Sequence, residues 1–277
     1  MLLVYIAAAI VGGAIGSFLN VVIDRVPAGG SLLGPPSHCP ECGRRLGFAE
    51  MVPVLSYVAL RGRCRTCGSH IPLRVLWVEL ATALLFALSI WRYGVTGNLA
   101  LALPFLCVLL VLFVIDLEHK IVPNVIVLPA IALALLSIPV QAYLLEPRFG
   151  HYALPALFLR ADSVLNLRDV GGLSQLIGGL FAFGVFLTIW LVAPRGMGAG
   201  DVKLAALCGI LTGIPAAVAA VFGSFILGGF VGGGLLLAGV AGRKTAIPFA
   251  PFLVVTTAVA MLFLDELVRA YLVSLFG

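Results

Sequence analysis

The stretch Gly198-Ala199-Gly200-Asp201-Val202-Lys203-Leu204 places one carboxylate at the start of an apolar helix. A second carboxylate, Asp116, follows the long uncharged run 99–115. An ionisable residue at the boundary of a membrane segment indicates a functional site. Two such acids that meet, share a proton and hold a water would supply the acid and the base of aspartic proteolysis. The pair therefore predicts that the helix ends carrying Asp116 and Asp201 come together.

The composition indicates a polytopic membrane protein. Of the 277 residues, 62% are hydrophobic and 10% charged, and the mean hydropathy is +1.17. This is more apolar surface than one soluble core of this length can bury. No charge precedes Asp24, so the chain lacks the basic start of a secretory signal peptide, and 2–23 is expected to be a retained transmembrane helix. The net charge of +5 fits membrane topology better than nucleic acid, and we expect no nucleic-acid partner.

The apolar runs predict an all-α membrane bundle of about eight transmembrane helices, given roughly 20 residues per crossing. Only Thr212-Gly213-Ile214-Pro215 separates the sixth run from the seventh, so a broken helix or a short sixth span is the alternative there. Glycine pairs on the seventh run, Gly228 with Gly232 and Gly229 with Gly233, predict close helix packing. The runs are 2–23, 75–91, 99–115, 122–145, 173–193, 202–218, 217–241 and 247–264.

The distribution of Lys and Arg predicts the orientation. If the 24–74 loop is cytoplasmic and eight spans alternate from it, twelve of the 17 basic residues lie inside and five outside, as the positive-inside rule requires. This places Asp116 and Asp201 on the same, cytoplasmic side. The segment between Glu146 and Gly172 is then the longest outside loop, and we assign it no chemistry.

The 24–74 loop contains two CxxC pairs, Cys39-Pro-Glu-Cys42-Gly43 and Cys64-Arg-Thr-Cys67-Gly68. Paired knuckles match the tetrahedral thiolate geometry of a structural Zn²⁺ site, and each following glycine lets the backbone turn toward sulfur. Two disulfides would need an oxidising compartment, and a thioredoxin-like pair needs only one CxxC. Because four cysteines leave no open position, a structural role is expected. His38 and His70 are surplus neighbours, and Cys107 and Cys208 are expected to be buried apolar side chains.

Several further residues leave two interpretations open. Asn20 either forms an interhelical hydrogen bond or belongs to a site. Glu79 either reaches back to the basic loop or belongs to a site. Lys203 either acts on Asp201 or anchors the helix at the inner face. Gly198 and Gly200 are expected to let a substrate backbone approach Asp201.

Five ordered stretches together resemble the type IV prepilin peptidase family. A GxGD sequence alone would be weak, but the five pieces span nearly the whole chain. This sequence has Ala199 inside GxGD, Ala250 where glycine is common, and Asn124 where aspartate is common. The pieces are Gly16-Ser17-Phe18-Leu19-Asn20-Val21-Val22-Ile23, the paired CxxC loop, Ile115-Asp116-Leu117 with Pro123-Asn124, Gly198-Ala199-Gly200-Asp201-Val202-Lys203-Leu204, and Ile247-Pro248-Phe249-Ala250-Pro251-Phe252-Leu253.

The resemblance implies a multi-pass inner-membrane aspartic endopeptidase. Such enzymes remove the short basic leader from type IV prepilins and the pseudopilins of type II secretion at the cytoplasmic face, and members with the cysteine loop N-methylate the new N-terminus with S-adenosylmethionine. Asp116 and Asp201 correspond to the catalytic pair. The zinc ligands correspond to Cys39, Cys42, Cys64 and Cys67. Asn20 and Glu79 are weak candidates for the cofactor site, because no Rossmann loop is present.

The expected organisation has a first transmembrane helix (1–24), a zinc-binding loop domain (25–74) and a peptidase core (75–277). Two other functions compete with leader peptidase activity. A presenilin-like protease shares GxGD but cuts within a substrate helix. An ion or metal transporter would favour acids at mid-membrane and broken helices, whereas Asp116 and Asp201 are expected at the ends of helices.

Overall fold

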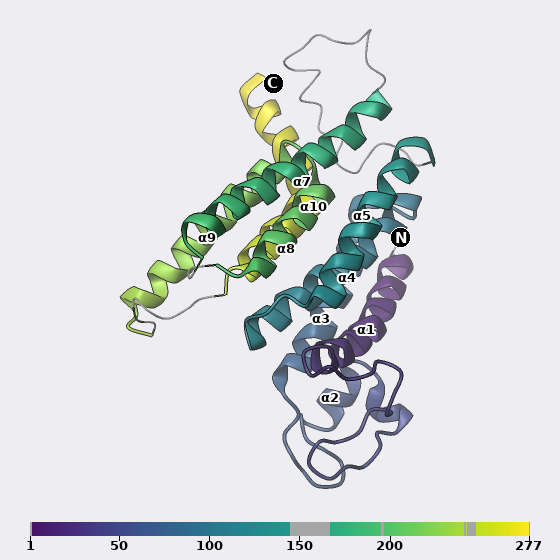
Figure 1. Cartoon of the computed structure of the whole chain (residues 1–277). Coiled ribbons are helices and arrows are strands. Elements are labelled where there is room, and N and C mark those ends of the chain that lie inside the picture. Colours follow the sequence, from purple (N-terminus) through teal and green to yellow (C-terminus); the bar gives the residue numbers. More distant parts are fainter. Residues whose placement is uncertain (1, 145–166, 195–196, 241, 243–247, 277) are drawn as a thin grey trace. The chain divides into compact units, whose positions relative to one another are not determined.

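The computed structural model describes residues 2–144, 167–194, 197–240, 242 and 248–276. Within these ranges the regular structure is helical, and the only β contacts are two isolated bridges in the cysteine loop. The chain divides into two compact units, Met1–Val111 and Leu112–Gly277. In Figure 1 the colours follow the sequence, so the first unit runs from purple to blue and the second from teal to yellow. The predicted all-helical class is confirmed. Most of the loop expected outside the membrane lies beyond the described residues.

Each of the eight predicted apolar runs contains a helix among the described residues. Six of the helices, α1, α3, α4, α5, α7 and α9, are long and apolar enough to cross a membrane. Helix α8 has 14 residues, and Ala250–Leu264 of α10 is also shorter than a full span. The helices are α1 (Leu2–Arg25), η1 (Phe48–Met51), α2 (Leu55–Ala59), α3 (Leu73–Tyr93), α4 (Gly97–His119), α5 (Asn124–Leu144), α7 (Leu167–Val192), α8 (Ala199–Thr212), α9 (Ala216–Leu237) and α10 (Ala250–Phe276).

In the first unit, α1 packs along α3 through a glycine seam (Figure 1). A Cβ placed on Gly12 would lie 2.8 Å from the Thr82 carbonyl oxygen, and one on Gly16 would lie 2.8 Å from the Glu79 Cα. Small residues at i and i+4 let two helix backbones approach closely, which maximises van der Waals contact where lipid provides no hydrophobic driving force. The expected close approach of α1 is therefore present.

Gly12→Ala is expected to destabilise the first unit by roughly 1–3 kcal/mol, because the added methyl must displace backbone atoms of α3. Gly13→Ala is the matched control on the same helix, since its Cβ would meet only Pro53 at an ordinary 3.4 Å. Both changes gain the same helix propensity. Thermal unfolding in detergent should show a lower Tm for Gly12→Ala alone. Equal Tm values would contradict the packing argument.

In the second unit, the closest helix pair is α7 with α8. A Cβ on Gly209 would lie 2.2 Å from the Gly178 carbonyl oxygen, so neither helix tolerates a side chain at this crossing. Helix α8 then stops at Thr212, and Gly213 adopts a left-handed φ of +65°. Ser174 of α7 fastens this break, because its hydroxyl accepts from the Ile214 N–H at 3.0 Å and donates to the Ile214 carbonyl at 2.8 Å. The short sixth helix foreseen as an alternative is the one observed.

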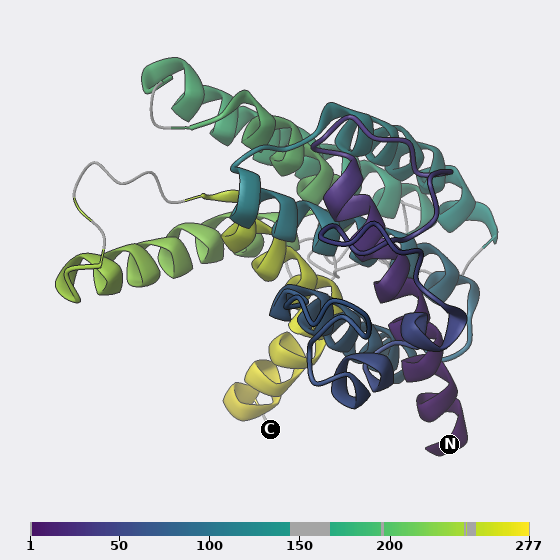
Figure 2. The same ribbon diagram turned by 90° about the horizontal axis from the view of Figure 1, so that it is seen from below.

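The two predicted glycine pairs on α9 differ in their surroundings. Gly229 and Gly233 have no described atom within 4 Å of an added Cβ, and the C-terminal end of α9 stands apart from its unit in both views (Figures 1 and 2). A Cβ on Gly228, in contrast, would lie 3.2 Å from the Phe252 ring of α10. The prediction of close packing was therefore wrong for Gly229 and Gly233, whereas Gly228 does pack closely against α10.

Candidate active site and candidate metal centre

Asp116 lies in the last turn of α4 and is only 4% exposed. Its Oδ2 is buried and has no hydrogen-bond partner among the described residues. The helix closes directly after it, where the Lys120 N–H donates to the Asp116 carbonyl at 2.9 Å and Lys120 takes a left-handed φ of +55°. A buried carboxylate oxygen without a protein partner is costly unless it serves a site.

Asp201 lies in the first turn of α8 and is partly buried. Its Oδ2 accepts the N–H of Gly198 at 3.1 Å, as a capping residue does. The carboxyl group thus lies at the positive end of the helix dipole. Asp116 and Asp201 lie near enough for their charges to interact. Both belong to the second compact unit, so the structure brings together the two acids that the sequence singled out.

Two further contacts bring the start of α8 against the turn after Asp116. Lys203 donates from Nζ to Asn124 Oδ1 at 2.8 Å, across 79 residues of sequence. A Cβ on Gly200 would lie 2.8 Å from the Val122 Cβ. Gly200 therefore has a packing reason to be glycine, because Val122 fills the space beside it. The room for a substrate backbone expected at Gly198 and Gly200 stays a prediction.

The N-terminus of α10 is a third element at this site. The backbone N–H of Ala250 is within hydrogen-bonding reach of the Asp116 carboxyl group. The preceding Phe249 fixes this end of α10, since its ring centroid lies 5.5 Å from that of Phe186 on α7 and 5.1 Å from that of Phe225 on α9. We did not predict this contact. The Pro248-Phe249-Ala250-Pro251 sequence was the available signal, because proline in the first helical turn marks a helix start.

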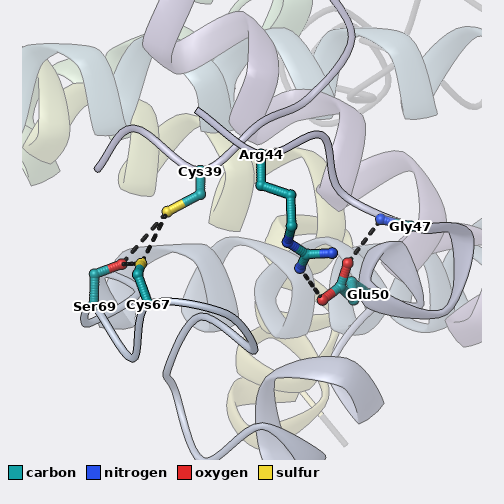
Figure 3. A network of polar contacts seen from close by, with 6 residues as sticks. All are labelled: Cys39, Arg44, Gly47, Glu50, Cys67 and Ser69. Carbon is teal, nitrogen blue, oxygen red and sulfur yellow. Dashed lines mark hydrogen bonds and ion pairs between the residues drawn. The ribbon is translucent and has the colours of Figure 1, made fainter. Parts of the chain in front are cut away.

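The candidate metal centre lies in the first unit. The four Sγ atoms of Cys39, Cys42, Cys64 and Cys67 all lie within 4.8 Å of one another, and Cys39 Sγ is 3.8 Å from Cys67 Sγ (Figure 3). Four sulfurs at the corners of a tetrahedron around Zn²⁺, each about 2.3 Å from the ion, would be roughly 3.8 Å apart. None of the six cysteines forms a disulfide. The cluster therefore fits a four-thiolate metal ion.

The two CxxC knuckles have the same backbone design. The Cys39 N–H bonds the Arg44 carbonyl at 2.9 Å, and the Cys64 N–H bonds the Ser69 carbonyl at 2.8 Å, five residues on in each case. The glycines after the second cysteines have φ of +67° and +72°, as the sequence predicted. An isolated bridge closes each knuckle, His38 with Arg45 and Arg63 with His70. Both histidines are exposed, in agreement with their expected role as solvated neighbours.

The groups around the four sulfurs shift the pKa values of the cysteines. A hydrogen bond from Ser69, followed by the backbone N–H groups of Cys42 and Glu41, lowers the pKa of Cys39 to about 6. For Cys42, the Arg44 N–H lowers the pKa, but burial and the neighbouring sulfurs outweigh it and raise the value to about 11. Four thiols this close cannot all ionise unless a cation offsets the charge. Arg44 also lies near the Cys64 sulfur and pairs with Glu50 (Figure 3).

Asn20 and Glu79 both connect helices in the first unit. Asn20 donates from Nδ2 to the Val75 carbonyl of α3 at 3.1 Å, which is the interhelical hydrogen bond considered from the sequence. Glu79 is 4% exposed and its Oε2 accepts the Val54 N–H at 2.7 Å, so it reaches the backbone of the cysteine loop and not a basic side chain. A cofactor role for either residue stays a prediction.

Two protein-family profiles match the chain. Residues 10–93 match the bacterial peptidase A24 N-terminal domain, and residues 103–233 match the type IV leader peptidase family. The first match includes all four clustered cysteines, and the second includes Asp116 and Asp201. No solved structure matches significantly.

Several relatives cover nearly the whole chain. The prepilin leader peptidase/N-methyltransferase of Bacillus subtilis (strain 168) is 30% identical over 268 residues, which is 97% of this chain and 98% of the relative. That of Pseudomonas aeruginosa is 32% identical over 287 aligned positions, covering 95% of this chain and 91% of the relative. The Myxococcus xanthus protein is 48% identical over 114 residues, 41% of this chain and 34% of the relative. The resemblance seen in the sequence is confirmed, and the chain belongs to the type IV leader peptidase family.

Proposed function

We propose that this chain is a bifunctional prepilin peptidase. It removes the basic leader of type IV prepilins or pseudopilins at the cytoplasmic face of the inner membrane and N-methylates the new N-terminus. The observation that carries the proposal is the buried, unpartnered Oδ2 of Asp116 beside the Asp201 carboxyl group. Family membership favours this function over a presenilin-like protease or a transporter.

The pair supports hydrolysis without a covalent intermediate. Two close carboxyl groups cannot both ionise cheaply, so they share one proton. The ionised member draws a proton from a water held between them, and the protonated member donates to the scissile carbonyl oxygen. The shared proton belongs to the pair and not to either residue. The N-termini of α8 and α10 direct positive partial charge toward these acids, which stabilises negative charge that develops during attack.

Lys203 acts in this proposal as a positioning residue. Its hydrogen bond to Asn124 fixes the start of α8 to the start of α5, close to the turn that follows Asp116. We do not assign Lys203 as a partner of Asp201, because its Nζ donates to Asn124 Oδ1. The bond thus sets the separation of the two acids without touching the reaction.

Lys203→Met is expected to lower kcat roughly 10- to 100-fold with little change in KM, because a misplacement near 1 Å is enough for such a loss. Asn124→Ala should give a similar loss, and the double variant no more than either single change, because one bond is removed in each case. Asn124→Asp should preserve activity by accepting from the same Nζ. Losses that multiply in the double variant would contradict a shared role.

The cysteine cluster would hold a structural Zn²⁺, whose place is to fix the loop of the first unit. With four protein ligands the ion would have no open position for substrate. The methyl donor in this proposal is S-adenosylmethionine, as the names of the relatives suggest. The division into a first helix (1–24), a zinc-binding loop domain (25–74) and a peptidase core (75–277) stays a prediction.

Mass spectrometry of a prepilin incubated with purified enzyme tests both activities in one measurement. Without S-adenosylmethionine we expect the leader to be released and the mature N-terminus to be unmodified. With excess S-adenosylmethionine the mature product should gain one methyl group. A cleaved but unmethylated product in both cases would reject the second activity. An intact prepilin would reject the proposed function, and cleavage inside the apolar helix of the substrate would favour the presenilin-like alternative.

A further inference from the structure

The cysteine loop contains an uncharged segment that is apolar and exposed. Residues 51–60 (Met-Val-Pro-Val-Leu-Ser-Tyr-Val-Ala-Leu) carry no charge, between Glu50 and Arg61. They form the end of η1 and helix α2. An exposed apolar patch of this kind marks an interaction surface. The exposed apolar side chains of this segment are Met51 (41%), Leu55 (69%) and Val58 (63%), and Phe48 (86%) at the start of η1 adds to them.

This segment contacts the sides of the two helices, α1 and α3, that the loop connects. Pro53 packs against Gly13 of α1, where an added Cβ would lie 3.4 Å from the Pro53 Cβ. The Val54 N–H donates to Glu79 of α3 at 2.7 Å. Both α1 and α3 are membrane-spanning helices, and Gly13 lies near the middle of α1. The loop therefore folds back along the flanks of two transmembrane helices.

An ion pair marks the polar boundary of this helix pair. Arg74 donates to Asp24 at 2.6 Å, where α1 ends and α3 begins. At 1.5 Å per residue, Glu79 lies about 8 Å and Gly13 about 16 Å from this boundary, toward the apolar interior. The half-thickness of a hydrocarbon core is about 15 Å. The backbone of residues 53–54 is thus at membrane depth.

The same depth explains the buried Glu79. A backbone N–H that faces hydrocarbon must find a partner within the protein. Val54 is the N-cap of α2, so its N–H has no partner within that helix, and its φ of +62° is unusual for a β-branched residue. Glu79 accepts that N–H, and the Ser17 hydroxyl of α1 is also within hydrogen-bonding reach of its carboxyl group. One buried acid thereby fastens the segment to both helices.

We propose that residues 48–59 form a re-entrant segment embedded in the bilayer that α1 and α3 cross, with Phe48, Met51, Leu55 and Val58 against lipid acyl chains. The occupant is lipid because these exposed apolar side chains belong to a segment that packs against Gly13 and Glu79, inside two membrane-spanning helices. The one acid of the segment, Glu50, is held by Arg44 and by the Gly47 N–H at 2.7 Å, so its charge is offset.

Tryptophan quenching tests the depth of the segment. Leu55→Trp and Val58→Trp replace exposed apolar residues, and Leu33→Trp is the control, because Leu33 is fully exposed in the same loop. The control residue lies beyond the boundary, since Arg25 at the end of α1 donates to the Ser31 carbonyl at 2.9 Å. Each variant is placed in vesicles of phosphatidylcholine brominated on its acyl chains, and the emission of the unaltered protein is subtracted.

Bromolipid is expected to remove most of the added emission of Leu55→Trp and Val58→Trp, whereas aqueous iodide should leave it. Leu33→Trp should respond in the opposite way. Iodide quenching at positions 55 and 58 equal to that at 33, with no effect of bromolipid, would overturn the proposal.

The role of Glu79 is tested in the Leu55→Trp protein. Glu79→Leu removes the acceptor and should expose Trp to iodide, whereas Glu79→Gln keeps an acceptor oxygen and should preserve the bromolipid quenching. If Glu79→Leu leaves the quenching unchanged, the acid does not fasten the segment.

Discussion

Asp116→Asn and Asp201→Asn are each expected to lower prepilin cleavage by at least 10²- to 10⁴-fold, the range that general acid–base catalysis contributes. An amide has nearly the shape of a carboxylic acid but cannot take up or release the proton that the pair must share. The buried Asp116 should tolerate the change well, because a neutral amide is easier to bury than a charge. The measurement is the rate of leader release from a purified prepilin.

Glu118→Gln is the matched control for this experiment. It removes an acid from the same helix end, two residues from Asp116, where the side chain is exposed. Membrane insertion and Tm should be unchanged in all three variants. Full cleavage by either aspartate variant would exclude that residue from the mechanism, and an equal loss in Glu118→Gln would point to a general effect of charge at this helix end.

Replacing any one of Cys39, Cys42, Cys64 and Cys67 by serine is expected to remove the metal and unfold the cysteine loop. Structural Zn²⁺ sites contribute about 10–16 kcal/mol of binding free energy to folding, so the loss of one ligand outweighs the other contacts of the loop. Bound zinc measured by mass spectrometry should fall from one equivalent to none. The loop should also become sensitive to trypsin at Arg44, Arg45, Arg61, Arg63 and Arg65.

Acid should release the same ion. Folding lowers the pKa of Cys39 from 9.0 to about 6. The ionised thiolate therefore stabilises the folded loop fully above pH 9, and this stabilisation is lost as the pH falls through about 6. Cys107→Ala is the control, because Cys107 lies on α4 and outside the cluster. A zinc content that is the same in the ligand variants and in this control would show that the cluster does not hold the metal.

The sequence was sufficient to predict the long apolar helices and the cysteines that cluster, but not η1 and α2. Uncharged runs marked each long apolar helix, because a span must exclude charge over nearly its whole length. The CxxC-Gly repeats predicted the knuckles, since four thiolates need a backbone that turns toward each sulfur. Asp116 and Asp201 were recognisable because an ionisable residue at the boundary of an apolar run indicates a site.

What the sequence could not provide were contacts decided by which helices become neighbours. The sequence marked glycine pairs on α9, whereas the closest glycine contact of this unit joins Gly178 of α7 to Gly209 of α8, which no spacing within one helix indicates. The bond from Lys203 to Asn124 spans 79 residues and has no local signature. Glu79 was visible as a buried acid, but its partner is a backbone N–H, which every residue except proline carries.

The meeting of the two acids is the central claim, and cross-linking tests it most directly. Asp116→Cys and Asp201→Cys are combined in a protein with a protease site inserted within 145–166, and a short thiol-reactive linker is added. We predict that the two fragments stay joined after proteolysis, and that the pair Leu117→Cys with Asp201→Cys, whose first residue is exposed, joins far less. Fragments that separate in the first pair as readily as in the second would contradict the account.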